Sequence, residues 1–330
     1  MPIHGIAQLN YAVKDLGEAN KFLDVFGLSK VDETSSSSTF EVLSGQRVYV
    51  RHLGDPALPP SSVIGDGVHE AIWAIADQPS FDRLLADLSR DHQITTDSDG
   101  TAHFVTDFGQ AIGLRLQQFR PVVSSPSPFN APGVTNRLNA PRKWSTRAIP
   151  KTISHAVWGV PDVDEVFAFY RDRLNFRLSD VQKGFGLYLR APRSTNHHSV
   201  FLADANLEML GFSGKLQFHH ANFGLEDIDE IMVGKNYLER HGYDTKGWGF
   251  GRHRLSSEAF LYVPSPLGGQ AEYGADCDQV DDRWKPRVWE ANFGAALFVH
   301  DMPEFLSREP EWDVTYATPE TSRFLPFDHK

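Results

Sequence analysis

The length of 330 residues leaves room for about two domains, and 41% hydrophobic with 23% charged residues excludes a largely disordered or collagen-like chain. The net charge of −11, with no run of basic residues, argues against a nucleic-acid partner, and the single cysteine cannot form an intrachain disulfide. No stretch approaches the ~18 apolar residues of a membrane span, and the first residues lack the layout of a signal peptide, so we expect a cytoplasmic protein without membrane contact.

The first part of the chain contains two weak copies of one pattern, a strand followed by a helix. The first copy begins at Tyr11 and reaches a helix start at Asp15, and the second begins near His69 and Glu70. Prolines then recur from residue 121 to 151, where they would interrupt any helix or interior strand. This segment is the predicted connection between two halves, either as an ordered arm along the surface or as a flexible linker.

The second part of the chain repeats itself without a gap. The segments that begin at His155 and at His220 align, and in both an aspartate follows seven positions later, at Asp162 and Asp227. Such an aspartate suits a helix N-cap, and apolar residues at helical spacing follow it. Short apolar runs after the helices predict further strands over residues 186–190, 199–202, 259–263 and 270–273.

Each repeated unit is therefore predicted as β-α-β-β-β, with two units in each half. A unit of ~55 residues has one sheet face to bury and too little core to stand alone, so we expect the units to pair. We predict an α+β fold of four βαβββ modules, paired into two domains of curved mixed sheets with the helices outside. The predicted parts are an N-terminal domain (1–120), a Pro-rich linker (121–151), a C-terminal domain (152–284) and an extension (285–330) that wraps back onto one of the halves.

Two histidines and a glutamate in the C-terminal domain form a candidate metal site. His155 and His220 occupy equivalent repeat positions, so pairing of their units about a pseudo-twofold axis would bring both imidazoles together. Glu272, on the last predicted strand, offers a third ligand. Two imidazoles and one carboxylate on one side of a divalent ion leave the opposite positions open, which is the arrangement that binds a substrate and dioxygen at Fe(II).

A longer motif leads up to this glutamate. Gly251-Arg-His253 is followed, after seven residues, by Leu261-Tyr262-Val-Pro-Ser-Pro266 and then by Glu272. This run resembles the motif of type I extradiol ring-cleavage dioxygenases of the vicinal oxygen chelate (glyoxalase/bleomycin resistance/dioxygenase) superfamily. One position departs from that motif, because Ser265 stands where the family usually has Asp, Glu, Asn, Thr or Ala. The resemblance covers the C-terminal half strongly and the N-terminal half only through the repeat.

The resemblance implies a metal cofactor, Fe(II) with Mn(II) as the alternative, bound by His155, His220 and Glu272. It also implies that His253 and Tyr262 hydrogen-bond the substrate oxygens and assist proton transfer. The partners would be O2 and a small aromatic diol, which could be monocyclic, bicyclic or larger. The reaction would be extradiol cleavage, in which both atoms of O2 enter the catechol-type ring beside its hydroxyls.

The family also has a histidine near the dioxygen site, at the start of the strand before the second ligand. Two neighbours, His197 and His198, are candidates. We predict His198, because placing Val200 in the strand puts His198 at the family's position, whereas His197 would face the other side. By resemblance, His198 would stabilise charge on the oxygen and then donate a proton. The 22 positions from His198 to His220 exceed the family's interval, with residues 203–214 as the apparent insertion.

The N-terminal half is predicted to be a metal-free duplicate. Its alignment with the C-terminal half places Tyr11 at the position of His155, and phenol is a poor substitute for an imidazole ligand. A shared Gly-Gln-Ala places Ile112 at the position of Glu272, so that no carboxylate closes the site.

Two other functions compete with ring cleavage. The first is a metalloenzyme of the same superfamily of the isomerase or epimerase type, against which His198, His253 and Tyr262 argue. The second is a non-catalytic protein that sequesters a ligand, which would need neither Glu272 nor an open metal position. Exposed edges of the paired modules favour a homo-oligomer in every case.

Overall fold

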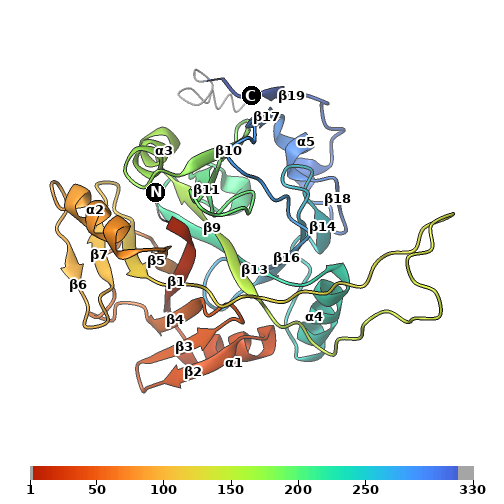
Figure 1. The fold of residues 1–330 in the computed structure, drawn as a ribbon, viewed down its shortest axis with the longest axis horizontal. Helices are drawn as coiled ribbons and strands as arrows, with labels where there is room; N and C mark the ends of the chain where they lie inside the picture. The colour runs from red at the N-terminus through yellow and green to blue at the C-terminus, as the bar shows by residue number, and fades with distance from the viewer. Residues whose placement is uncertain (1–2, 319–330) are drawn as a thin grey trace.

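The structure, a computed structural model, describes residues 3–318 and contains two sheets (Figure 1). The first sheet belongs to the N-terminal half, and its strands lie in the order β2-β3-β4-β1-β5-β8-β7-β6. Its elements are β1 (Ile3–Val13), α1 (Leu16–Phe26), β2 (Ser29–Glu33), β3 (Ser37–Glu41), β4 (Arg47–His52), β5 (Gly67–Ile75), α2 (Gln78–Leu88), β6 (Thr95–Thr96), β7 (Ala102–Val105) and β8 (Ala111–Leu116).

The second sheet belongs to the C-terminal half, in the order β18-β14-β15-β16-β13-β9-β12-β11-β10-β17-β19. Its modules consist of β9 (Thr152–Val160), α3 (Val163–Asp172), β10 (Arg177–Gln182), β11 (Gly186–Arg190), β12 (Val200–Asp204), the 3-10 helix η1 (Glu208–Leu210), β13 (Gln217–Gly224), α4 (Ile228–Arg240), β14 (Phe250–Arg252), β15 (Ala259–Pro264) and β16 (Gln270–Ala275). The extension adds β17 (Arg287–Trp289), α5 (Ala291–Ala295), β18 (Phe298–Val299), the 3-10 helix η2 (Glu304–Leu306) and β19 (Val314–Tyr316).

The predicted βαβββ modules are confirmed, and they run from β1 to β4, β5 to β8, β9 to β12 and β13 to β16. Each module helix begins after an aspartate whose carboxylate accepts the backbone N–H three residues further on, which satisfies a donor that the first helical turn leaves free. These N-caps are Asp15, Asp77, Asp162 and Asp227. Among residues 3–318, no helix has the length and apolar character needed to cross a membrane.

The modules pair through their first strands, because β1 runs antiparallel to β5 and β9 runs antiparallel to β13. The C-terminal sheet repeats the strand order of the N-terminal sheet and adds strands at both of its ends. Strands β17 and β19 lie outside β10, and β18 lies outside β14. Residues 287–316 therefore pack along both edges of the sheet that carries the candidate metal ligands.

The two halves share one hydrophobic core. Phe26 of α1 stacks on Tyr273 of β16 with the ring centroids 4.1 Å apart, and the Tyr273 hydroxyl donates to the Phe26 carbonyl at 2.7 Å. Trp158 of β9 donates its indole N–H to the Val68 carbonyl of β5 at 3.2 Å. These contacts join the C-terminal sheet firmly to the N-terminal half.

Residues 121–151 form an arm without helices or regular strands, which projects from the molecule between β8 and β9 (Figure 1, yellow-green). Ion pairs hold the second part of the arm near the start of α4. The Lys143 Nζ lies 2.6 Å from Glu226 Oε1, and the Lys151 Nζ lies 2.9 Å from Glu230 Oε2. The arm also exposes large apolar side chains to solvent, namely Val123, Phe129, Val134, Leu138, Trp144 and Ile149.

Candidate metal centre

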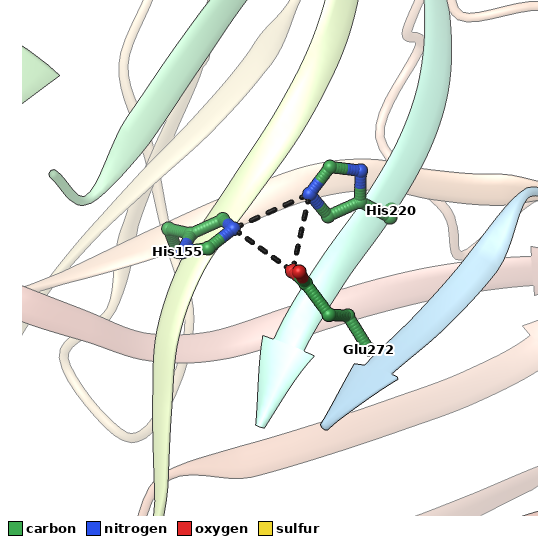
Figure 2. A group of neighbouring side chains, drawn as sticks. All are labelled: His155, His220 and Glu272. Carbon is green, nitrogen blue, oxygen red and sulfur yellow. Dashed lines mark hydrogen bonds and ion pairs between the residues drawn. The ribbon is translucent and has the colours of Figure 1, made fainter. Parts of the chain in front are cut away.

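Three strands of the C-terminal sheet bring together the side chains of His155 (β9), His220 (β13) and Glu272 (β16), as Figure 2 shows. His155 pairs with Asn222 across the antiparallel strands, and Asn222 pairs with Glu272 across the parallel strands. The two histidine Nε2 atoms are 3.3 Å apart, and Glu272 Oε2 lies 3.2 Å from the first and 3.3 Å from the second. The structure thus gathers the three side chains that the sequence nominated as metal ligands.

The chemistry of this cluster fits a divalent cation. The exposed fractions of His155, His220 and Glu272 are 3%, 5% and 0%. Neither Glu272 oxygen accepts a hydrogen bond from any residue in the described part of the chain. Burying a carboxylate without partners is costly, and a cation between the three donor atoms would offset that cost. Two imidazole nitrogens and one carboxylate oxygen on one side are the ligand set of Fe(II) or Mn(II) sites with open positions.

His219 contacts the ring nitrogen of His220 that lies away from the cluster. Their Nδ1 atoms are 2.6 Å apart. Burial lowers the pKa of His219 to about 4, so the ring is neutral near neutral pH and its Nδ1 can accept the proton on His220 Nδ1. This contact leaves the lone pair of His220 Nε2 directed at the cluster. His219 was not among the predicted site residues, because its only sequence signal is its position beside a ligand.

Glu258, just before β15, is a second buried carboxyl beside the cluster. Its Oε2 lies 4.0 Å from His155 Nδ1, on the side of that ring away from the ligand atom Nε2. The close packing depends on Gly274, because a Cβ there would lie 2.3 Å from Glu258 Oε1. Burial, and then the Glu272 carboxylate, raise the pKa of Glu258 well above its usual range. Sequence reasoning missed Glu258, whose role depends on tertiary packing alone.

Of the two histidines considered for the dioxygen side, His198 faces the cluster and His197 faces the core. The His198 ring lies beside the His155 ring, with centroids 4.0 Å apart. His197 is completely buried, and its Nε2 lies 3.1 Å from Oδ2 of Asp180. Burial lowers the pKa of His198 well below its usual range, which keeps its imidazole neutral.

His253 and Tyr262 lie beside the cluster and contact each other. The Tyr262 hydroxyl is 3.3 Å from His253 Nε2, and the Tyr262 ring packs against His220. His253 Nδ1 donates to the Ala295 carbonyl at 2.5 Å. The remaining nitrogen of the neutral His253 ring, Nε2, is therefore an acceptor for the Tyr262 hydroxyl.

A cavity opens from this cluster, and its walls combine polar and aromatic side chains. Its polar lining residues include His155, His198, His220, His253, Glu258 and Tyr262. Its aromatic lining residues include Phe185, Tyr188, Phe201 and Trp248. Tyr188 and Phe201 stack with their centroids 4.1 Å apart. Such a cavity suits an aromatic ring that carries polar substituents.

The N-terminal sheet carries Gln8 at the position that corresponds to His155, so the predicted alignment of Tyr11 with His155 is wrong. Seven positions separate His155 from its helix N-cap, and the same interval before Asp15 leads to Gln8. Tyr11 instead lies in the core, where its ring meets Phe218 edge to face. The Ala-Val pair shared by the segments at Tyr11 and His155 therefore does not mark equivalent strand positions in the two sheets.

The other two ligand positions also carry different residues in the N-terminal sheet. Glu70 occupies the position of His220, and Gly113 occupies the position of Glu272, because β5 and β8 pair in the same register as β13 and β16. The predicted alignment of Ile112 with Glu272 is one residue off, and a shift of one residue moves a side chain to the opposite face of a sheet. The three equivalent positions thus carry an amide, a carboxylate and no side chain.

The carboxylate of Glu70 has partners of its own. Asn10 Nδ2 donates to one oxygen at 2.5 Å, and His103 Nδ1 lies 2.7 Å from the other. Gln8 donates in turn to Asn10 at 2.6 Å. This network therefore differs from the centre around Glu272, whose oxygens lack donors. Within residues 3–318, two groups of three side chains could hold a metal ion, and both lie in the C-terminal half: His155, His220 and Glu272, and His155, His198 and Glu258.

The module topology and the two-histidine, one-glutamate cluster together define a class of protein. The sequence model of the Glyoxalase/Bleomycin resistance protein/Dioxygenase superfamily matches residues 152–246. This match supports the resemblance inferred from the sequence, and the similarity to solved structures of the same fold confirms the predicted fold.

Individual members similar to this chain are found by sequence and by structure. Metapyrocatechase 2 of Cupriavidus necator is 28% identical over 323 residues, which cover 94% of this chain and 93% of that protein. The Mn(II)-bound glyoxalase from Novosphingobium aromaticivorans is similar in structure with a TM-score of 0.70 at 21% identity, covering 93% of this chain and 95% of that one. A halotolerant catechol dioxygenase is similar with a TM-score of 0.70 at 19% identity, covering 91% and 94%.

Proposed function

We propose that this chain is an extradiol ring-cleavage dioxygenase, which inserts both atoms of O2 into a catechol-type substrate beside its hydroxyls. The observation that carries the proposal is the convergence of His155, His220 and Glu272, with both Glu272 oxygens free of protein donors. Similarity to a metapyrocatechase along nearly the whole chain supports the same activity.

His155 and His220 would hold Fe(II), or Mn(II), through their Nε2 atoms, and Glu272 through a carboxylate oxygen. When bound, the metal supplies a common site for the two diol oxygens and dioxygen and lowers the proton affinity of the hydroxyls. His219 lies at the Nδ1 atom of His220, where it can orient that ring. Glu258 Oε2 lies 4.0 Å from His155 Nδ1, which is beyond hydrogen-bond distance.

The pair of Tyr262 and His253 can take a proton from the diol. His253 Nε2 accepts the hydroxyl proton of Tyr262, because His253 Nδ1–H is already bound to the Ala295 carbonyl. The lone pairs of the Tyr262 oxygen remain available to a substrate hydroxyl. A proton can therefore pass from the substrate to the Tyr262 oxygen while the original Tyr262 proton passes to His253.

We propose His198 as the acid–base group on the dioxygen side. The side chain lies in the cavity wall beside His155, and its neutral ring can hydrogen-bond to charge that develops there and can move one proton. Loss of a positioned acid–base group typically lowers the rate by about 10²–10⁴-fold. The stacked pair of Tyr188 and Phe201 would hold the substrate ring in the aromatic part of the cavity.

Anaerobic purification with metal analysis, followed by an oxygen-electrode and yellow-product screen over catechols of increasing size, tests the proposal. We expect metal-dependent consumption of one O2 for each diol opened. An isomerase or epimerase of the same superfamily would convert its substrate without consuming O2. A sequestering protein would bind a diol and leave both the diol and O2 unchanged.

We also propose that the working unit is a homo-oligomer, in which the arm of residues 121–151 contacts a second copy. Three of the arm's five basic residues, Arg142, Lys143 and Lys151, already form ion pairs within the chain, so the contact with a second copy would rest on the arm's apolar side chains. Its exposed Phe129, Leu138 and Trp144 would otherwise remain in water. Light scattering of the full chain and of a Phe129→Ser/Leu138→Ser/Trp144→Ser variant tests this, with a lower mass expected for the variant.

A further inference from the structure

A line of three buried side chains leads from the core of the C-terminal sheet to His198. Asp180 of β10 contacts His197 Nε2 through Oδ2 at 3.1 Å, and His197 Nδ1 lies 3.2 Å from His198 Nδ1. Asp180 and His197 have no exposed surface, and His198 has 4%. Only the last of the three lines the cavity, so the first two can influence the substrate only through it.

The extension beyond the modules holds the Asp180 carboxylate in place. β17 pairs in parallel with β10, and Asp180 lies opposite Arg287. The Arg287 backbone N–H donates to Oδ1 at 2.6 Å, and the Trp289 indole N–H donates to Oδ2 at 2.9 Å. An ionised carboxylate only accepts hydrogen bonds, so the nitrogen of His197 that faces Asp180 must carry a proton.

The two imidazoles are also held by aromatic neighbours. The Trp284 ring meets the His197 ring edge to face, with centroids 5.9 Å apart at 90°. Tyr188 meets His198 in the same way, at 5.0 Å and 89°. These contacts oppose rotation of either ring, so the Nδ1 atoms stay opposite each other.

The positions of the protons follow from these contacts. With its proton on Nε2, His197 offers a lone pair at Nδ1, which can accept the Nδ1 proton of His198. His198 then presents Nε2, without a proton, to the cavity. We propose that Asp180 and His197 are positioning residues that set this tautomer of His198, so that its cavity-facing nitrogen first accepts a proton.

This arrangement deepens the proposed ring-cleavage function and rests on it. A proton that leaves a substrate hydroxyl would bond to His198 Nε2, and the resulting imidazolium would keep its Nδ1–H directed at His197. The buried Asp180 carboxylate would stabilise that positive charge through His197. The same proton would later return from Nε2 to the oxygen of the opening ring, so that His198 regains its starting form.

Asp180→Asn and His197→Phe test the proposal by kinetics. The asparagine has no negative charge and only one oxygen for the N–H groups of Arg287, Trp289 and His197, so it no longer holds the His197 proton on Nε2. We expect kcat for a catechol to fall about a hundredfold or more in both variants, with metal content and KM for the diol unchanged. Trp289→Phe is the matched control, because it removes one donor to Asp180 and keeps the carboxylate beside His197. We expect it to lose less kcat than Asp180→Asn, because the Arg287 backbone N–H still holds the carboxylate.

A second readout does not depend on turnover. In the Zn²⁺-loaded protein with ¹⁵N-labelled histidine, we expect a proton on Nδ1 of His198 in the wild type and on Nε2 in Asp180→Asn. Wild-type kcat in Asp180→Asn, an equal loss of kcat in Trp289→Phe, or a wild-type His198 protonated on Nε2 would each overturn the proposal. Failure of the wild type to consume O2 with any diol would instead overturn the proposed function, and the spectra would still decide the tautomer.

Discussion

Arg173 at the end of α3 forms a two-pronged ion pair with Asp91, which follows α2. Nη1 lies 2.6 Å from Oδ2, and Nη2 lies 3.0 Å from Oδ1. The Arg173 guanidinium lowers the pKa of Asp91 from 3.8 to about 2. The pair joins a helix of the N-terminal half to a helix of the C-terminal half, so it contributes to the contact between the two sheets.

This pair predicts a pH-dependent contribution to stability. The pKa of Asp91 is lower in the folded chain than in the unfolded chain, so the contribution is present above about pH 4 and is lost as the pH falls toward about 2. We expect Arg173→Met to lower the free energy of unfolding modestly near neutral pH, because the pair is partly exposed, and to have less effect in acid. Urea titrations of both proteins over this range measure the difference. Arg171→Met, which breaks a pair with the neighbouring Asp172, is the control.

The metal ligands can be tested against their counterparts in the other sheet. We expect His155→Ala and Glu272→Ala to abolish both metal binding and turnover, because each removes one of the three proposed ligands. Gln8→Ala, at the equivalent position of the N-terminal sheet, is the matched control and should keep both properties. Tyr11→Phe should keep them as well. Metal analysis after dialysis and an oxygen electrode give the two readouts, and loss of metal from the Gln8 variant would contradict the assignment of the centre.

The contact between His219 and His220 predicts an effect on metal affinity. We expect His219→Leu to weaken metal binding by about 10–100-fold, since the leucine cannot accept the Nδ1 proton of His220. His219→Gln offers an amide oxygen and should lose less. Competition with a chelator measures the affinities, with the exposed His300→Leu as the control. An unchanged affinity in His219→Leu would mean that His220 needs no partner at Nδ1.

Removal of the metal should lower the thermal stability of the protein. Binding to the folded chain alone adds about 2.7 kcal/mol when the free metal exceeds its Kd a hundredfold. Calorimetry before and after chelation should therefore show a lower Tm for the apoprotein, and added Fe(II) or Mn(II) should restore it. His155→Ala should show no such shift. A shift of equal size in that variant would place the bound metal elsewhere.

The patterns that predicted the fold each consist of residues that are close together in the sequence. The seven-residue interval from His155 to Asp162 recurs from His220 to Asp227 and sets both the strand and the helix N-cap of each C-terminal module. Such an interval is readable without tertiary information. Glu272 could be predicted only from the family motif. Its distance in sequence from the two histidines follows no local pattern.

Other features depend on contacts that only the folded chain makes. The shared Ala-Val aligns Tyr11 with His155 in the sequence, whereas the interval to the helix N-cap leads to Gln8. Glu258 and Asp180 gained their positions from Gly274 and from β17, which lie far away in sequence. Strands as short as β17 form because a neighbouring edge offers hydrogen bonds, and a three-residue segment has no period to detect.

Because the two sheets share one strand register, the metal ligands of the C-terminal sheet can be assigned to equivalent positions of the N-terminal sheet. Gln8→His, Glu70→His and Gly113→Glu would copy the three ligands onto the N-terminal sheet. A side chain at Gly113 would collide with Ile72, whose Cγ1 lies 2.7 Å from the Cβ position. The transplant therefore needs a fourth change, Ile72→Asn, which reproduces Asn222. A second metal site on the N-terminal sheet therefore needs four substitutions, three for the ligands and one for the space that the glutamate side chain occupies.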